Sequence, residues 1–287
     1  MKLLTSFNIA LMGTALGKTQ AASSNSPRFL HRLQNHTFTH SPSHTYSEST
    51  FNIDPVSQKN IYYTDNWSGG VLLASKLTET PTLTSVAATI TVPVPTPSST
   101  RVQAASAWVG IDGFVNTGAI LQTGIDIVAF KGATGGQEAH SYSAWYEWYP
   151  QDAVGFDDDL AVEAGDVLVL SVFSTSTSGL TGVAIIQNQS TGQNVSATVQ
   201  GPAGAALSGQ SVEWIVEDYM TGGSLVSFVD FGTVTFEGAV TGAEGNLTFG
   251  VGEDGVNVDI VDLVDVDENK IVAKASIVGD GVTVIYQ

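Results

Sequence analysis

From Asn66 onward the chain is a series of short runs of aliphatic, β-branched and aromatic residues, separated by Gly, Ser, Thr and Pro. Runs of this length and spacing are typical of strands in a mostly antiparallel sheet. The predicted strands are 86–92, 105–111, 119–128, 141–149, 167–173, 183–189, 212–219, 228–236, 258–264, 271–277 and 282–286. No segment has the 3.6-residue period of a helix longer than three turns. The sequence therefore predicts an all-β sandwich or barrel.

The chain has 287 residues and no cysteine. The length fits one large all-β domain with additional processing segments. The absence of cysteine excludes disulfide bonds, thiolate metal sites and a cysteine nucleophile. A fold of this size can be stabilised by burial of apolar surface alone.

The first 60 residues differ from the rest of the chain. Lys2 precedes an apolar stretch that ends near Ala15-Leu16-Gly17, which predicts a signal peptide over 1–17 and a secreted, extracellular protein. Residues 18–60 are rich in Ser, Asn, His and Pro, and we interpret them as a basic pro-segment. The domain proper is expected over 61–287. Sequons at Asn35, Asn66, Asn188, Asn194 and Asn246 are compatible with a glycoprotein.

The distribution of charged residues also changes near residue 60. Residues 1–60 hold five of the ten Lys and Arg and two acids, whereas residues 61–287 hold 26 acids and five bases. Such an acidic body is a poor partner for nucleic acid or an anionic membrane. It is a suitable partner for its own basic pro-segment, which acid would release by discharging the carboxylates. We expect no metal, no cofactor and a monomer.

Two predicted strands have faces that are unusual for a dry core. In 141–149, alternation places Ser143, Trp145, Glu147 and Tyr149 on one face, and in 213–217 both glutamates share a face. Aromatic and acidic side chains on one face favour an aromatic-lined groove. The acids between 259 and 268 also alternate along a predicted strand, and there we expect a solvent-exposed face.

Most hydrolase signatures are missing. His140 is the only histidine after the leader, and Gly-x-Ser-x-Gly, His-Glu-x-x-His and paired Asp-Thr-Gly or Asp-Ser-Gly motifs are absent. The residues alone leave two classes open. One is a two-carboxylate glycosidase or carbohydrate-binding sandwich that would use Glu147 and Glu217, and the other is a peptidase with a carboxylate base.

A resemblance favours the peptidase. Six segments carry it: 66–70 (Asn-Trp-Ser-Gly-Gly), 107–113 (Ala-Trp-Val-Gly-Ile-Asp-Gly), 121–126 (Leu-Gln-Thr-Gly-Ile-Asp), 144–150 (Ala-Trp-Tyr-Glu-Trp-Tyr-Pro), 213–219 (Glu-Trp-Ile-Val-Glu-Asp-Tyr) and 231–234 (Phe-Gly-Thr-Val). In this order they resemble the glutamic peptidases, or eqolisins, over roughly residues 62–287. Known members carry disulfides, and this chain departs from them in having no cysteine.

The resemblance implies a fold and a site. The fold is a double β-sandwich of two curved antiparallel sheets, a concanavalin-like jelly roll with the active site on the concave face. The implied catalytic pair is Gln122 and Glu217, with Glu217 chosen over Glu213 by its place in the motif. The implied substrate-binding or supporting residues are Trp108, Asp112, Asp126, Trp145, Glu147 and Tyr149.

The resemblance also implies a reaction. Glu217 would activate a water that attacks the scissile carbonyl of a polypeptide substrate, and Gln122 would stabilise the oxyanion without a covalent intermediate. A carboxylate with an ordinary pKa near ~4.3 is a usable base in acid, so we expect an acid endopeptidase. The acidic body predicts better stability at pH about 3–4 than above neutrality, because its self-repulsion falls as carboxylates discharge.

Overall fold

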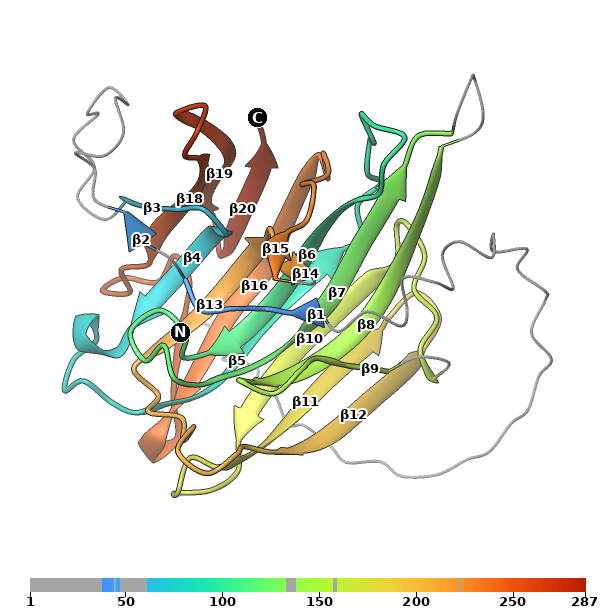
Figure 1. Cartoon of the computed structure of the whole chain (residues 1–287). Coiled ribbons are helices and arrows are strands. Elements are labelled where there is room, and N and C mark those ends of the chain that lie inside the picture. Colours follow the sequence, from blue (N-terminus) through green and yellow to red (C-terminus); the bar gives the residue numbers. More distant parts are fainter. Residues whose placement is uncertain (1–37, 44, 47–60, 133–137, 157–158, 222) are drawn as a thin grey trace. The chain divides into compact units, whose positions relative to one another are not determined.

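The computed structural model describes residues 38–43, 45–46, 61–132, 138–156, 159–221 and 223–287 (Figure 1). The predicted signal peptide lies outside the described residues. Of the predicted pro-segment, the structure describes only 38–43 and 45–46. The regular secondary structure of the described residues is almost entirely β-strand, with 3₁₀ turns at Ala74–Lys76 and Glu244–Asn246. No helix among them is long and apolar enough to cross a membrane.

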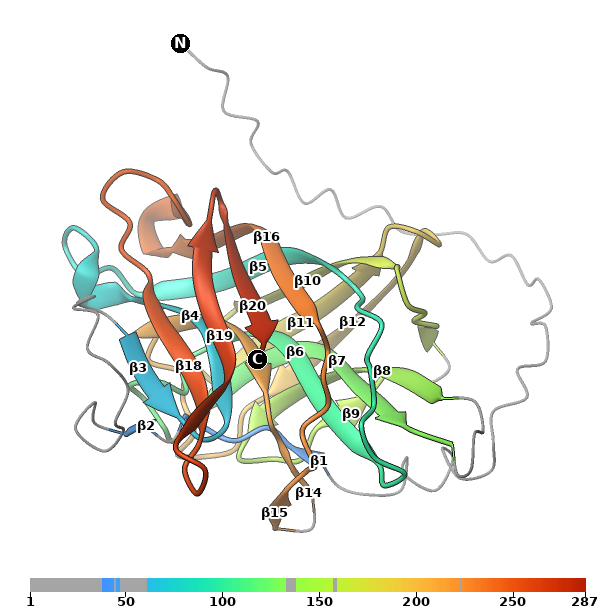
Figure 2. The same cartoon turned by 90° about the horizontal axis from the view of Figure 1, so that it is seen from above.

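Two antiparallel sheets form the sandwich (Figures 1 and 2). The sheet that carries the candidate site, here called the site sheet, contains in spatial order β9 (Val154–Gly155), β8 (Ala139–Tyr149), β7 (Ile120–Phe130), β6 (Gln103–Ile111), β13 (Ser211–Glu217), β4 (Trp67–Leu73) and β18 (Asp259–Asp265). It continues through β19 (Lys270–Val278) and β20 (Gly281–Tyr286), while β3 (Ile61–Thr64) lies parallel to β18 and pairs with β2 (Thr45–Tyr46).

The second sheet, here called the back sheet, has the order β12 (Gln193–Gln200), β11 (Thr181–Asn188), β10 (Val167–Ser174), β5 (Leu83–Thr91), β16 (Thr233–Ala243) and β17 (Leu247–Gly250). Strand β16 belongs to both sheets. Its first residues, Thr233 to Phe236, pair with β20, and from Glu237 onward it pairs with β5 through a register shift. Such irregularities let one strand cross from one sheet of a sandwich to the other.

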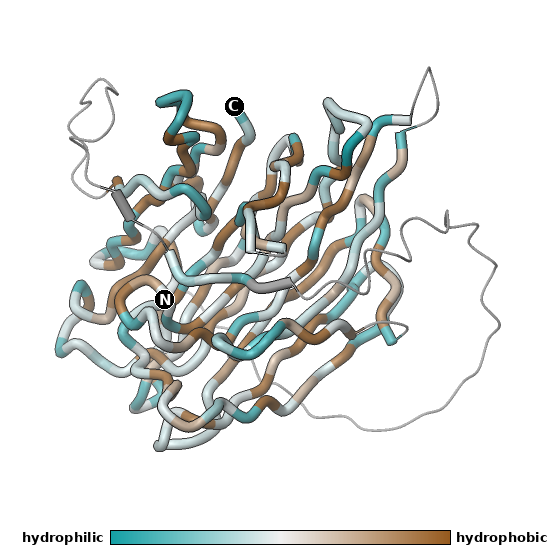
Figure 3. The backbone as a smooth tube through the Cα atoms, viewed as in Figure 1, coloured by the Kyte–Doolittle hydropathy of each residue, from teal (hydrophilic) through white to brown (hydrophobic). Residues whose placement is uncertain are grey.

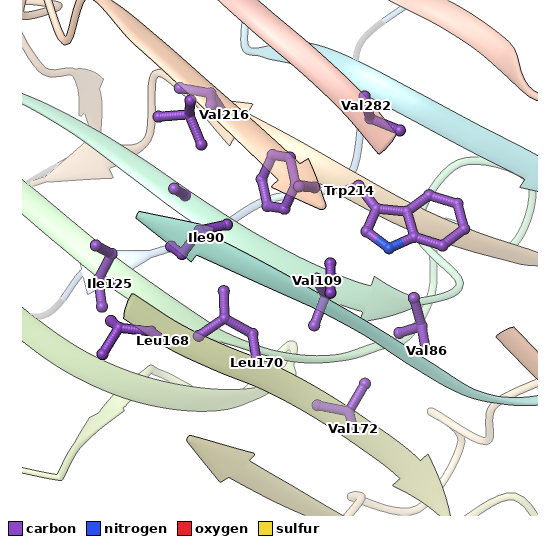
Figure 4. Packing of buried hydrophobic residues seen from close by; sticks show 14 of the residues in the cluster. Val86, Ile90, Val109, Ile125, Leu168, Leu170, Val172, Trp214, Val216 and Val282 are labelled. Carbon is purple, nitrogen blue, oxygen red and sulfur yellow. The ribbon is translucent and has the colours of Figure 1, made fainter. Parts of the chain in front are cut away.

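The main core lies between the sheets. Along β10, Leu168, Leu170 and Val172 are buried while the intervening residues are only partly buried, as the two-residue period requires. They pack with residues of the site sheet such as Val109 and Trp214 (Figure 4). Figure 3 shows the corresponding hydrophobic bands along both sheets. The all-β sandwich predicted from the sequence is confirmed.

A smaller apolar cluster covers the opposite face of the site sheet. It contains Trp67, Val71, Trp108, Ile120, Trp145, Ile215 and Val261. The strands β6 and β13 are therefore buried along their whole length, on both faces. This second buried face, away from the back sheet, is where the candidate site lies.

The structure corrects one prediction about charge. The acids of β18 do not form a solvent-exposed face, because Asp259 and Asp262 are buried. Lys76 forms an ion pair with Asp259, and Asp262 accepts a 2.8 Å hydrogen bond from the backbone N–H of Ala275. Buried carboxylates with such partners are structural groups of the sandwich.

The strand predictions differ from the structure mainly in their bounds. The predicted strand 228–236 contains only the start of β16, which continues to Ala243, and the strand predicted over 212–219 ends at Glu217. Among the described strands of four or more residues, four were not predicted: β3, β4, β12 and β17. The two-residue strands were not predicted either.

Candidate active site

The register of the site sheet brings the predicted residues onto one face. Gln122 of β7 lies opposite Glu147 of β8, and Asp126 of β7 and Glu217 of β13 both lie opposite Ser106 of β6. Directly opposite residues in a ladder project to the same face of a sheet. Three consecutive strands, β6 to β8, and the distant strand β13 therefore contribute to one site.

The side chain of Trp108 lies on the same face and bonds to Glu217. Its indole Nε1 donates a 2.8 Å hydrogen bond to Glu217 Oε2, and both side chains are fully buried. Two glycines leave space for the indole. A Cβ at Gly124 would lie 2.5 Å from Trp108 Cβ, and one at Gly110 would lie 2.9 Å from Trp108 Cζ3. Any side chain at these positions would displace the ring that holds Glu217.

Residues of the predicted pro-segment occupy the same face. Strand β1 (Phe38–Thr39) pairs antiparallel with β14 (Met220–Thr221), which in turn pairs with β15 (Ser224–Leu225) (Figure 1). The chain then continues through His40, Ser41 and Pro42, all of which are buried. An added strand followed by buried backbone is how many proteins hold an extended peptide.

Gln122 and Glu217 contact a single peptide group of this segment. The side-chain amide of Gln122 donates a 3.0 Å hydrogen bond to the carbonyl oxygen of His40. The backbone N–H of Ser41 donates a 3.0 Å hydrogen bond to Glu217 Oε1. The His40–Ser41 peptide bond therefore lies between the two side chains that the sequence predicts to be catalytic.

Further hydrogen bonds hold the backbone on either side of that peptide bond. The N–H of His40 donates to Glu147 Oε2 at 3.2 Å, and the Trp67 indole donates to the carbonyl oxygen of Ser41 at 3.0 Å. Asn66 Nδ2 donates to the carbonyl oxygen of Pro42 at 3.1 Å. Each contact is made to the backbone of the segment, so it does not depend on the side chains of that segment.

The His40 side chain occupies a pocket beside the pair. Its ring stacks on Trp145 with a centroid separation of 3.8 Å and an interplanar angle of 7°. Imidazole Nε2 lies 3.6 Å from Asp126 Oδ1, and Nδ1 lies 3.3 Å from Glu217 Oε2. Trp145 and Asp126 thus line the pocket that holds the His40 ring.

Burial changes the acid–base properties of these groups. It raises the pKa of Asp126 to about 6, an effect that the neighbouring His40 partly opposes. Burial, and then the charge of Glu217, raises the pKa of Glu147 well above its usual value. Burial lowers the pKa of His40 to about 4, against the attraction of Asp126. At pH about 3–4 Asp126 and Glu147 are accordingly protonated. Glu217 accepts hydrogen bonds from two N–H groups, those of Ser41 and of the Trp108 indole.

Two predicted residues, Asp112 and Tyr149, form none of the described hydrogen bonds to the His40–Ser41 peptide, and neither does Glu213, the alternative to Glu217. The Asp112 carboxylate accepts hydrogen bonds from the backbone N–H groups of Ser208, Gly209 and Gln210. It therefore stabilises the loop 208–210. Tyr149 is partly buried against the apolar cluster of the site face. Glu213 is buried opposite Gly110, and among the described contacts it is Glu217, not Glu213, that bonds to the segment.

The sequence analysis missed several residues of the site. Trp67 and Asn66 belong to the 66–70 motif, for which no role in the site was predicted. Tyr219, whose ring centroid lies 5.1 Å from that of His40, is the last residue of the 213–219 motif. His40 and Ser41 carry no signal in the sequence beyond their place in a basic leader.

Comparisons with known proteins point to one family. The model of the Peptidase A4 family matches residues 65–286. The chain is 38% identical to Aspergillopepsin-2 of Aspergillus niger over 239 residues, and this alignment covers 79% of each of the two chains. It is 32% identical over 210 residues to Scytalidopepsin B of Scytalidium lignicola, covering 72% of this chain and 71% of the relative.

A solved structure agrees as well. Scytalido-glutamic peptidase with a peptide-based transition state analogue is similar to this chain with a TM-score of 0.62 and 30% identity, over 78% of this chain and 98% of that one. These findings confirm the resemblance and do not favour the glycosidase that the residues alone left open. The chain belongs to the Peptidase A4 family, and it is a glutamic endopeptidase.

Proposed function

We propose that this chain is a secreted, acid-acting endopeptidase in which Glu217 activates a water molecule and Gln122 stabilises the oxyanion. One observation carries the proposal. The Gln122 amide and the Glu217 carboxylate bond to the carbonyl oxygen and the N–H of one peptide group. A peptidase needs a donor at the carbonyl oxygen, where charge develops, and a proton carrier at the nitrogen, where the amine leaves.

The proposed reaction has two steps and no covalent intermediate. Ionised Glu217 removes a proton from a water that attacks the carbonyl carbon, and the Gln122 amide stabilises the resulting oxyanion. Protonated Glu217 then gives its proton to the leaving nitrogen, and the C–N bond breaks. The 3.0 Å contact between Glu217 Oε1 and a peptide nitrogen is consistent with this second transfer.

The electrostatics of the site favour Glu217 as the base in acid. Burial raises the pKa of both Asp126 and Glu147, so at pH about 3–4 these neighbours are neutral. Glu217 accepts a hydrogen bond from Trp108, which favours its ionised form. Different environments thus separate the roles of three acids that lie on one face. Asp126 and Trp145 are then proposed to bind substrate, and Glu147 to hold its backbone.

The leader supports secretion of the protein as an inactive precursor. We propose that 1–17 is a signal peptide, that 18–60 is a pro-segment, and that the described part of this pro-segment blocks the site before activation. Polypeptides are the proposed substrates, and the protein is proposed to act as a monomer. Asn194 and Asn246 are exposed and remain candidates for glycosylation, whereas Asn66 and Asn188 are buried.

The test compares three variants at pH about 3.5 on a denatured protein substrate. Glu217→Gln should lose about 10³-fold or more in kcat/KM, and Gln122→Ala about 10²- to 10³-fold. Glu213→Gln is the matched control, since it makes the same change on the same face of β13, and it should retain activity. Cleavage at the wild-type rate by either of the first two variants would remove that residue from the mechanism.

A further inference from the structure

We infer that the peptide bond between His40 and Ser41 is a self-processing site, which the catalytic pair of the same chain hydrolyses. The inference rests on the proposed function of Gln122 and Glu217 and adds to it a particular bond in the leader. It differs from simple blocking of the site, because a segment that only blocks would leave with its chain intact.

The first support is the position of this bond. Gln122 Nε2 lies 3.0 Å from the carbonyl oxygen of His40, and Glu217 Oε1 lies 3.0 Å from the nitrogen of Ser41. Hydrolysis acts on both atoms, since the oxygen gains negative charge as water attacks the carbonyl carbon and the nitrogen gains a proton as the C–N bond breaks. Both catalytic side chains therefore bond to this one peptide group: Gln122 donates to its oxygen, and Glu217 accepts from its N–H.

The second support is the way the flanking backbone is held. Before the bond, β1 adds as an antiparallel strand to β14, and the N–H of His40 donates to Glu147. After the bond, Trp67 donates to the carbonyl oxygen of Ser41. The segment is therefore fixed on both sides of one bond, in an extended form whose contacts any polypeptide substrate could make.

The third support is the covalent connection. The segment belongs to the chain that carries the site, so its effective concentration at the catalytic pair does not depend on the amount of protein present. The His40 ring is buried and stacked on Trp145, which keeps the bond in register. Cleavage in the same molecule is thus favoured over cleavage by a second molecule.

The step consumes one water and no other reactant. The water oxygen bonds to the carbonyl carbon of His40 while one water proton passes to Glu217. The C–N bond to Ser41 then breaks, and Glu217 returns the proton to the Ser41 nitrogen. The products are a leader fragment that ends in a carboxyl group at His40 and a chain that begins with a free amine at Ser41.

The experiment uses the full chain, purified near pH 7 and shifted to pH about 3.5. Intact mass and N-terminal sequencing follow the first cut over time, at two protein concentrations that differ about tenfold. We expect a new N-terminus at Ser41 that appears at the same rate at both concentrations. The same samples are assayed on a denatured protein substrate.

These two readouts separate the inference from the proposed function. If the sample digests the substrate while the His40–Ser41 bond stays intact, the inference is overturned and the proposed function stands. If the cut appears in proportion to protein concentration, self-processing within one chain is also overturned. If neither the substrate nor the leader is cut, the proposed function itself fails.

Two variants sharpen the result. Ser41→Pro removes the N–H that donates to Glu217, and it should abolish the new N-terminus at residue 41. Ser41→Ala keeps this N–H and removes only the hydroxyl, so it should be cut at the wild-type rate. Equal cutting of the two variants at this position would contradict the inference, and circular dichroism checks that both are folded.

Discussion

Trp108 Nε1 donates a 2.8 Å hydrogen bond to Glu217 Oε2 across two neighbouring strands, in a part of the site sheet that is buried on both faces. Hydrogen bonds to an ionised carboxylate are among the stronger ones, typically worth about 1.5–3 kcal/mol. The contact therefore does more than orient the carboxylate. It stabilises the charged form that a base must have.

Replacing this donor should change the pH dependence of catalysis. Trp108→Phe keeps an aromatic ring but removes the N–H, so the ionised carboxylate is less stable relative to the protonated one. We expect kcat/KM to fall about 10- to 100-fold at pH about 3.5. The acid limb of the pH–rate profile should move to higher pH, which a series of assays between pH about 2.5 and 6 would measure.

Trp214→Phe is the matched control. Trp214 lies on the opposite face of the same sheet, where its Nε1 donates to the carbonyl oxygen of Ala87 in the core. This variant should unfold at a lower temperature but keep the wild-type pH–rate profile. A similar shift of the profile in both variants would show that the effect is structural.

Asp112 should matter for stability more than for catalysis. Its carboxylate accepts three backbone N–H groups of the loop 208–210, and its own backbone has a φ of 64°. Asn tolerates this left-handed conformation, so Asp112→Asn tests the hydrogen bonds alone. We expect a loss of about 2–4 kcal/mol in the free energy of unfolding, measured in urea.

The kinetic readout separates this role from a catalytic one. At a temperature where the variant is folded, kcat/KM of Asp112→Asn should stay within about threefold of wild type, since the side chain lies outside the hydrogen bonds to the His40–Ser41 peptide. A loss of kcat comparable to that of Glu217→Gln, with unchanged stability, would assign Asp112 to the chemistry instead.

The success of sequence reasoning depended on how local each signal is. Alternation along 141–149 correctly placed Trp145 and Glu147 on one face, because the pleat alone decides this. Strand β4 was missed because Gly69 and Gly70 have low strand propensity. Tertiary packing explains a glycine here, since a Cβ at Gly69 would lie 2.0 Å from the carbonyl oxygen of Trp214.

The missed parts of the site are contacts between distant segments. Asp259 was expected to be exposed, but its partner Lys76 lies in another part of the chain and no local pattern links them. Motif position separated Glu217 from Glu213, whereas strand parity does not. The seating of His40 on Trp145 depends on the folded groove and has no counterpart in local sequence.

The buried acids predict that the fold is more stable in acid. Burial raises the pKa of Asp262 to about 6, against the hydrogen bond from Ala275 and the charge of Lys274. A group whose pKa is higher in the folded state contributes stability that is complete below its unfolded pKa near 3.8 and is lost as pH rises through about 6. Asp126 has the same sign over the same window, whereas its neighbour His40, whose pKa burial lowers to about 4, has the opposite sign.

Asp262→Asn should remove one part of this pH dependence. Its side-chain oxygen can still accept from the Ala275 N–H, but the group no longer ionises. We expect little change in the free energy of unfolding at pH about 4 and a gain of about 2 kcal/mol at pH about 7. Urea unfolding at both pH values, in a Glu217→Gln background that prevents self-digestion, measures the difference.

The exposed Asp267 provides the control for Asp262. Asp267→Asn should change stability by less than about 0.5 kcal/mol at either pH. If Asp262→Asn is no more stable at neutral pH than wild type, burial of this carboxylate does not oppose folding there. A wild-type protein that is as stable near pH 7 as near pH 4 would contradict the wider expectation.

The ion pair between Lys76 and Asp259 supplies a last test, this time of the sandwich itself. Asp259 is fully buried, while the Lys76 side chain is 26% exposed. Lys76→Met keeps the apolar stem but leaves a buried carboxylate without its counter-charge, which should cost about 3 kcal/mol at pH about 7. The double variant Lys76→Met/Asp259→Leu should recover most of this loss, because neither charge is then buried alone.

Lys270→Met, at an exposed position, controls for loss of a lysine. Equal stability of Lys76→Met and Lys270→Met in urea would mean that the pair does not hold the start of β18.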